Sequence, residues 1–202
     1  YILYESELRC EGPLETLRLW GANDRANIFV DEKPLLTLYD RELLTEHTLE
    51  EPRKKGDKLS ILMENMGRVN FGPNLERQRK GIDGSVQLNG HNHYHWKIYS
   101  LPMEDLSGLD FNIPVQKDAP GFYEFTFDAD ETGDTFLELD GWGKGCVLVN
   151  GFNIGRFWEI GPQKRLYIPA PLLKQGKNTI LVFETEGKAP GVVELCDEPD
   201  LG

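Results

Sequence analysis

The chain has 202 residues, of which 22 are Lys or Arg and 34 are Asp or Glu, so its formal net charge at pH 7 is -12. A charge of this sign repels phosphate backbones and anionic lipids, which argues against nucleic acid and membrane surfaces as partners. No apolar run approaches the ~18 residues that a membrane span needs. With 21 Gly and 12 Pro, the composition is typical of short strands joined by many turns, in one large or two small all-β units.

The three cysteines, Cys10, Cys146 and Cys196, are too few and too scattered for a disulfide framework, and no Cys or His spacing matches a zinc site. Cys146 lies inside an apolar run, where a small core residue is expected. We expect no cofactor. The sequence shows no signal peptide but begins with Tyr1 rather than Met, so a cytoplasmic location is only a working expectation.

Turn residues separate short apolar runs along the first third of the chain. We expect strands there at 2–4, 14–19, 26–30, 35–38 and 59–64. Further on, Asn89-Gly90 lies between the runs 86–88 and 94–99. An Asn-Gly pair between extended runs predicts a type I′ hairpin, because both residues tolerate positive φ. This hairpin is expected to complete the first of two β-sandwiches.

The segment 141–187 carries the densest β pattern. Its Asn150-Gly151 pair again predicts a type I′ hairpin. Strands are expected around and after it, at 146–149, 152–158, 165–168 and 179–183. Between the two strand-rich regions, residues 107–121 contain Pro114 and Pro120 and few alternating positions, so we expect a linker there.

The two strand-rich regions repeat each other at an offset of about 120 residues. Glycines that bound the strands recur at this spacing, as Gly21 and Gly141, Gly56 and Gly176, and Gly67 and Gly187. The runs 28–31 and 59–62 match 147–150 and 179–182. Two copies of one sandwich are the economical explanation.

Acidic residues are numerous, but their positions do not indicate catalysis. Glycoside hydrolysis commonly needs two carboxyl groups about 5 to 9 Å apart, one of them kept protonated. The acids cluster instead in turns and tails, at Glu50-Glu51, Asp128 to Glu131 and Asp197 to Asp200, as solvated charge does. No nucleophile elbow or phosphate-binding loop is present. The sequence therefore predicts no catalytic residue.

His91, His93 and His95 alternate along one predicted strand, which would place them on one face. Three imidazoles at this spacing can hold a transition metal. No Cys or acidic partner lies in the segment, so a solvated strand or turn face is the favoured interpretation, and we expect no metal site.

Aromatic rings near turns are the remaining candidates, because the C–H faces of a pyranose stack on them. Trp142 and Trp158 are possible sugar-stacking residues of this kind. Both adjoin strands in the densest part of the repeat, which favours core or interface packing.

The stretch GWGKGCVLVNGFNIGRFWEIGPQKRLYIPAPLLKQGKNTILVFETEG at 141–187 closely resembles the C-terminal segment of family 35 glycoside hydrolases. These are β-galactosidases whose catalytic domain is a (β/α)8 barrel. The resemblance extends upstream through LSILMENMGRVNFG at 59–72, KGIDG at 80–84 and WKIYSLPM at 96–103.

The resemblance implies an all-β chain of two antiparallel jelly-roll sandwiches of the galactose-binding-like type. The first would span 1–106 and the second 122–202, with the linker at 107–121. The family's two catalytic glutamates lie in the barrel, which is absent from this chain, so no residue here inherits a catalytic role. The expected partners are that barrel, a β-galactoside bound through the parent enzyme, and a second copy of the enzyme in an oligomer.

The implied function is the non-catalytic C-terminal portion of a β-galactosidase, which supports the barrel and shapes a subunit interface or the aglycone side of the site. The loop that contains RVNFG can approach the barrel mouth in this family, which makes Asn65, Arg68, Asn70 and Phe71 the expected substrate-side residues. Related sequences often have Tyr where Phe71 stands, so only stacking carries over. The alternatives are an independent carbohydrate-binding module and, less favoured, an enzyme in its own right.

Overall fold

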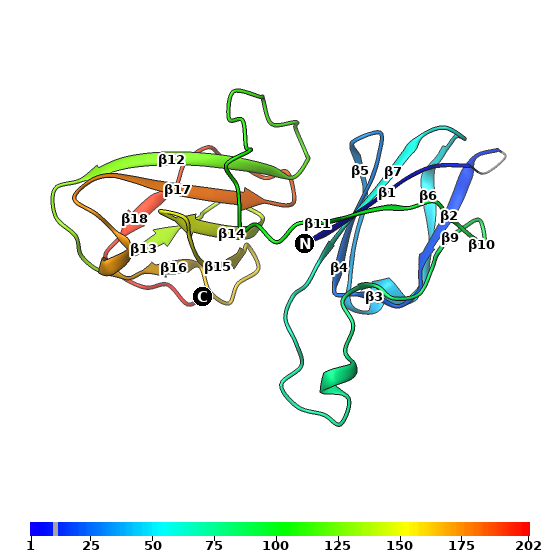
Figure 1. Cartoon of the computed structure of the whole chain (residues 1–202), viewed down its shortest axis with the longest axis horizontal. Coiled ribbons are helices and arrows are strands. Elements are labelled where there is room, and N and C mark those ends of the chain that lie inside the picture. Colours follow the sequence, from blue (N-terminus) through cyan, green and yellow to red (C-terminus); the bar gives the residue numbers. More distant parts are fainter. Residues whose placement is uncertain (10–11) are drawn as a thin grey trace. The chain divides into compact units, whose positions relative to one another are not determined.

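The structure is a computed structural model that describes residues 1–9 and 12–202. The described chain forms two compact units, Tyr1–Ser107 and Gly108–Gly202 (Figure 1). The boundary lies at the start of the segment expected as a linker. Cys10 and the side chains of Glu50 and Glu51 lie outside the described part, so the predictions about them stay predictions. No helix among the described residues is long and apolar enough to cross a membrane.

Unit 1 consists of two antiparallel sheets and a small ladder. The five-stranded sheet has the order β11-β1-β7-β4-β5 and contains β1 (Ile2–Glu7), β4 (Arg25–Val30), β5 (Lys33–Tyr39), β7 (Lys58–Glu64) and β11 (Lys97–Ser100). The four-stranded sheet has the order β10-β9-β2-β6 and contains β2 (Leu14–Leu19), β6 (Glu46–Arg53), β9 (Val86–Leu88) and β10 (His91–Asn92). The remaining elements are the β3 (Ala22–Asn23) and β8 (Gly81–Ile82) pair and the 3₁₀ helices η1 (Asp40–Leu44) and η2 (Leu75–Arg77).

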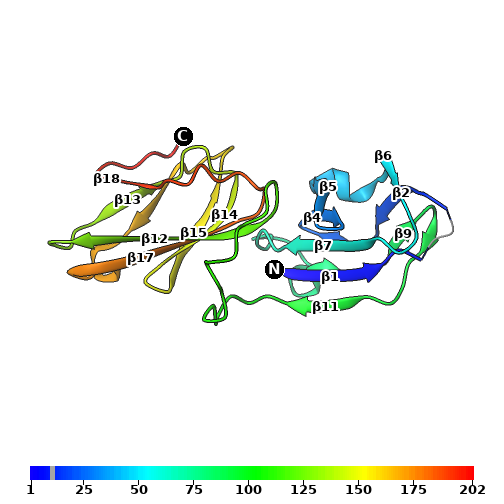
Figure 2. The same cartoon turned by 90° about the horizontal axis from the view of Figure 1, so that it is seen from above.

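Unit 2 also consists of two antiparallel sheets. The four-stranded sheet has the order β12-β17-β14-β15 and contains β12 (Gly121–Ala129), β14 (Lys144–Val149), β15 (Phe152–Trp158) and β17 (Gly176–Glu184). Figure 2 shows β12 and β17 side by side along this sheet. The three-stranded sheet, in the order β16-β13-β18, contains β13 (Thr135–Glu138), β16 (Arg165–Ile168) and β18 (Glu194–Cys196), and η3 (Ala170–Leu172) follows β16.

Each unit has its own hydrophobic core between its two sheets. In unit 1, Leu17 of β2 and Ile61 of β7 belong to one buried cluster although they lie in different sheets. In unit 2, Leu137 of β13 and Val182 of β17 lie in different sheets and belong to one buried cluster. Alternate residues of the central strands belong to these cores, Ala26, Ile28 and Val30 in β4 and Val147 and Val149 in β14, which is the period expected of a strand. The predicted all-β class is confirmed, whereas the finer jelly-roll topology stays a prediction.

The internal repeat is confirmed by strand order. The order β1-β7-β4-β5 in unit 1 corresponds to β12-β17-β14-β15 in unit 2. Both β4 with β5 and β14 with β15 form hairpins whose register shifts once, between Ile28 and Phe29 and between Val147 and Leu148. A bulge at matching positions is difficult to explain by chance, since bulges are specific features of a strand pair.

Both Asn-Gly turns form as predicted. Asn150 and Gly151 have φ of 49° and 86°, and Asn89 and Gly90 have φ of 48° and 75°. Cys146 is buried within β14, as predicted for a small core residue.

The strand predicted at 94–99 is wrong in its first half. Only His91–Asn92 returns along β9, and the chain then crosses to pair with β1 as β11. The extended run is interrupted at His95, whose φ is +69°, and the Ser6 hydroxyl donates to the carbonyl of Tyr94. His91, His93 and His95 therefore do not share one face of a strand.

The described turns and tails do carry exposed acids, but two glutamates are buried at strand ends. Glu64 ends β7 and pairs with the buried Arg25 guanidinium at 3.5 Å. Glu184 ends β17, and its carboxylate accepts backbone N–H bonds from Lys144 and from residues 186–188. Burial raises the pKa of the Glu184 carboxyl, and these N–H donors oppose that rise. Both glutamates therefore hold strand ends together.

Candidate functional site

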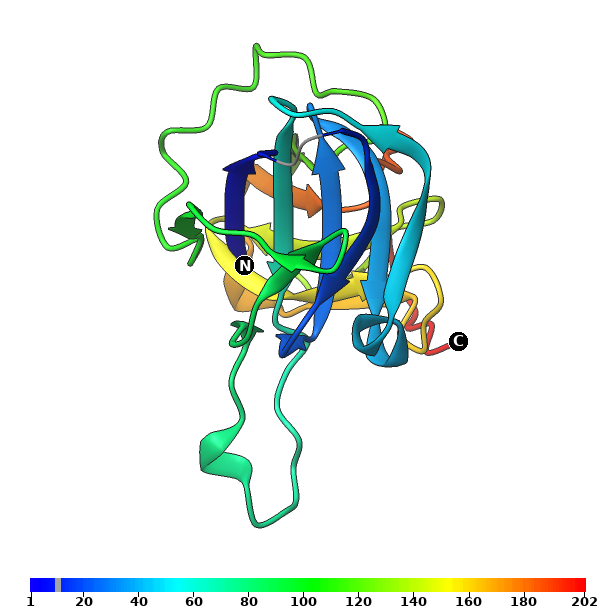
Figure 3. The ribbon, with the colours of Figure 1, turned by 90° about the vertical axis from the view of Figure 1, so that its right-hand side faces the viewer.

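The predicted substrate-side residues all lie in one loop of unit 1, between β7 and β8. Asn65, Arg68, Asn70 and Phe71 are exposed there, and the Phe71 side chain is 90% exposed. Figures 1 and 3 show this loop, with η2 near its end, extending away from the sheets of unit 1. The four side chains thus lie together on one projecting segment, while their substrate-side role stays a prediction.

A single carboxylate holds both ends of this loop. Asp24, which lies directly before β4, accepts the backbone N–H of Met66 at 2.8 Å. The Lys80 ammonium, at the other end of the loop, lies 2.6 Å from both Asp24 carboxylate oxygens. Charge-assisted bonds of this kind are stronger than neutral ones. Met66 and Lys80, near the two ends of the loop, are therefore held close together at Asp24.

The loop itself combines apolar and basic side chains. Val69, Phe71, Pro73 and Leu75 are among the residues around a shallow recess of about 320 Å³. Four basic residues and one acidic residue occupy 66–80, in a chain whose net charge is -12. An exposed ring beside guanidinium groups can stack on a sugar and donate hydrogen bonds to its hydroxyls.

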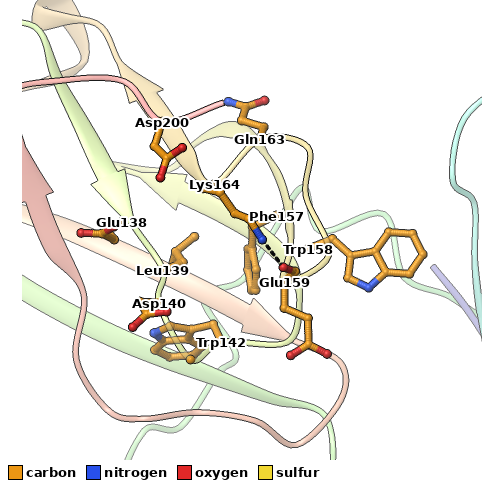
Figure 4. Close-up of a pocket in the computed structure, with 11 residues that line it drawn as sticks. Glu138, Leu139, Asp140, Trp142, Phe157, Trp158, Glu159, Gln163, Lys164 and Asp200 are labelled. Atoms are coloured by element: carbon orange, nitrogen blue, oxygen red, sulfur yellow. Dashed lines mark hydrogen bonds between the residues drawn. The ribbon is translucent and has the colours of Figure 1, made fainter. Parts of the chain in front are cut away.

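Unit 2 contains a smaller, more enclosed pocket of about 250 Å³ (Figure 4). It lies between the β13–β14 turn, the segment after β15 and the C-terminal tail. Trp142 and Phe157 form its aromatic side, and Asp140, Lys164 and Asp200 are among the polar residues around it. Figure 4 shows the Trp158 ring directed away from Trp142 and Phe157.

The acidic groups of this pocket differ in how they are engaged. Glu138 pairs with Arg165 at 3.1 Å, and Glu159 pairs with Lys188. The Asp200 carboxylate accepts the backbone N–H of Gly202 at 2.9 Å. Asp140 has no hydrogen bond or ion pair within residues 1–9 and 12–202, so its carboxylate is available to a ligand hydroxyl.

The two predicted stacking tryptophans have different environments. Trp142 is 1% exposed, contacts Tyr123 and Phe125 edge to face, and donates its indole N–H to the Val192 carbonyl at 2.7 Å. This burial leaves no ring face free for a sugar, so the packing interpretation applies to Trp142. The Lys144 ammonium lies 4.9 Å from the centre of the Trp158 ring, a cation–π contact that engages one face of it.

No group of three or more His, Cys, Asp or Glu residues in the described chain is placed to hold a metal ion. His91, His93 and His95 lie near one another around one pocket but do not form such a group.

Two family models match the chain, one for each unit. The β-galactosidase first all-β domain matches residues 1–102, and the β-galactosidase galactose-binding domain matches residues 120–178. The chain belongs to the β-galactosidase family. It carries two of the family's domains, one in each unit.

Relatives in this β-galactosidase family are distributed across animals and plants. β-Galactosidase-1-like protein 2 of Homo sapiens is 37% identical over all of this chain, and β-galactosidase 17 of Arabidopsis thaliana is 37% identical over 92% of it. The chain spans 32% and 31% of the lengths of these two relatives. A lectin from Pleurotus ostreatus aligns with 96% of this chain and 70% of its own at 12% identity, but its TM-score of 0.32 supports no argument.

The Asp24 carboxylate can be tested as the fixed base of the β7–β8 loop. We expect Asp24→Asn to increase trypsin cleavage after Arg68, Arg77 and Arg79 by about tenfold, because a charge-assisted pair contributes about 1.5 to 3 kcal/mol. The measurement is the rate of limited proteolysis, with cleavage sites identified by mass spectrometry. Asp130→Asn, at an exposed position of unit 2, is the control. Equal cleavage rates in both variants would show that Asp24 does not restrain the loop.

Proposed function

We propose that this chain is the non-catalytic β portion of an enzyme that hydrolyses terminal β-linked galactose with retention, and that it stabilises the catalytic portion. The observation that carries this proposal is the match of both units, in chain order, to all-β domains of β-galactosidases. The relatives are about three times as long as this chain, which leaves room for a catalytic barrel outside it. A contribution to a subunit interface and a cytoplasmic location stay predictions.

We assign the substrate-side role within this proposal to the β7–β8 loop. Phe71 would stack against the aglycone, and Arg68 and Asn70 would donate hydrogen bonds to sugar hydroxyls. Three features support the assignment: the exposure of the Phe71 ring, the basic charge of the loop, and the anchoring of both loop ends on Asp24. A side chain contributes to binding only if its backbone is held in place, because ordering a free loop costs about 1 to 2 kcal/mol per residue.

The test is a fusion in which this chain replaces the matching segment of the Mus musculus β-galactosidase, which is 34% identical over 97% of this chain. We expect the fusion to hydrolyse lactose and a mouse enzyme truncated before the segment to lose activity or solubility. Within the fusion, Phe71→Ala should lower kcat/KM about tenfold, which corresponds to about 1.4 kcal/mol of lost stacking.

Phe152→Ala, which removes an exposed ring from unit 2, is the matched control and should leave kcat/KM unchanged. A truncated enzyme as active and stable as the fusion would contradict the supporting role. Equal effects of Phe71→Ala and Phe152→Ala would contradict only the assignment of the loop.

A second candidate function is carbohydrate binding by unit 2, favoured by the pocket in Figure 4. Its uncommitted Asp140 carboxylate is a group that can accept hydrogen bonds from sugar hydroxyls. The buried Trp142 serves this pocket as a wall rather than as a stacking platform.

Isothermal titration of the purified chain with galactose and lactose tests this second function. Millimolar binding that falls at least tenfold in Asp140→Asn, and is kept in Asp130→Asn, would support it. Asp140→Asn is preferred to Trp142→Ala, because truncating a buried Trp costs about 3 to 5 kcal/mol and would disturb the core. No heat of binding at 50 mM sugar, about fifty times a millimolar Kd, would eliminate this second function.

A further inference from the structure

A pocket of about 490 Å³ in unit 1 lies beside the end of β1 and the β9–β10 hairpin. Three of the chain's four histidines line it, together with Arg9, Asn92 and Tyr94. None of the lining residues in the described chain is an acid. The lining thus differs from the chain as a whole, in which 34 acidic residues outnumber 22 basic ones. The proposed function does not involve this pocket.

Some of the polar groups in this pocket hold the fold. His93 is partly buried, its Nε2 lies 2.9 Å from the Ser6 hydroxyl, and its ring contacts the edge of Trp96. The Asn92 side-chain oxygen accepts a hydrogen bond from Gln87 at 3.1 Å. Burial lowers the pKa of His93. A hydrogen bond to the Glu7 backbone raises this pKa, and the positive charge of the nearby Arg9 lowers it further. We therefore count His93 and Asn92 as structural.

Four other groups are uncommitted. The side chains of Arg9, His91, Tyr94 and His95 make no hydrogen bond or ion pair with any residue in the described ranges, and all four are exposed at the pocket. Each carries an N–H or O–H donor, and Arg9 carries a permanent positive charge. Several donors grouped beside a permanent positive charge are an arrangement that can bind an oxyanion.

The charge of the surroundings does not prevent this. The charged residues on the adjoining strands include Glu5 and Glu7 of β1, Glu15 and Arg18 of β2, and Lys97 of β11. At physiological ionic strength, charges farther away than about 8 Å are largely screened, so the net charge of the chain has little effect within the pocket. The donors that contact the ligand determine the binding.

We propose that this pocket binds a small oxyanion, namely a carboxylate, sulfate or phosphate group, through Arg9, His91 and His95, with Tyr94 as a further donor. An acidic sugar and a free inorganic anion both supply this chemistry. The proposal does not depend on the β-galactosidase role, since it concerns only residues of unit 1 and a ligand added to the isolated chain.

The test is isothermal titration of the purified chain with sodium galacturonate, sulfate and phosphate at pH 5.5. Galactose, which has the same ring as galacturonate without the carboxylate, is the neutral comparison. We expect millimolar binding of at least one anion and at least tenfold weaker binding of galactose. Binding of galacturonate alone would identify an acidic sugar, and binding of all three anions would identify the oxyanion itself as sufficient.

Arg9→Gln and His91→Gln should each weaken the anion at least fivefold. His47→Gln, at the one histidine outside the pocket, is the matched control and should leave binding unchanged. Circular dichroism of each variant verifies the fold, and His91→Gln changes an exposed side chain that holds no other residue. The proposal is overturned if no anion binds, if galactose binds as tightly as galacturonate, or if all three variants bind alike.

Discussion

Each unit depends on one antiparallel ladder, β4 with β7 in unit 1 and β14 with β17 in unit 2. All four strands are paired along both edges, so their backbone N–H and C=O groups are satisfied without water. All six residues of β4 and of β14 are buried as a result. Loops can vary around such a ladder without loss of the core, which is why one sandwich pattern can occur twice with different sites.

The ladder also determines where the β7–β8 loop begins. Its register places Arg25 opposite Glu64, so Asp24, one residue earlier, lies next to the start of the loop. The Asp24 N–H donates to the Glu64 carbonyl at 3.0 Å, and its carboxylate can then hold Met66 and Lys80. In unit 2, Glu184 at the end of β17 accepts N–H bonds from Lys144 and from the segment that follows it. Removing one partner of a buried charged contact is costly, so these strand ends tolerate little substitution.

The sequence predicted what depends on neighbouring residues, namely the all-β class, the two Asn-Gly turns and the repeat. It did not predict the Asp24 contact, because Asp24 is 42 and 56 residues from its two partners and resembles any other turn aspartate. It also did not predict the burial of Glu64 and Glu184, because nothing in the neighbouring residues distinguishes a buried strand-end acid from an exposed one. The pocket of unit 2 was missed for a similar reason, because its residues come from three separate segments. The substrate-side residues and their loop came from family resemblance alone, and the structure adds the Asp24 contacts at both ends of that loop.

The central claim is that the two sandwiches belong to a β-galactosidase without containing its catalytic groups. The most direct measurement is the rate at which the purified chain hydrolyses o-nitrophenyl β-galactoside. We predict no release of nitrophenol above the uncatalysed rate, because catalysis in this account resides in a barrel outside the chain. Turnover that persists through repurification, and that is lost when an acid of the unit 2 pocket such as Asp140 is replaced by its amide, would contradict the account.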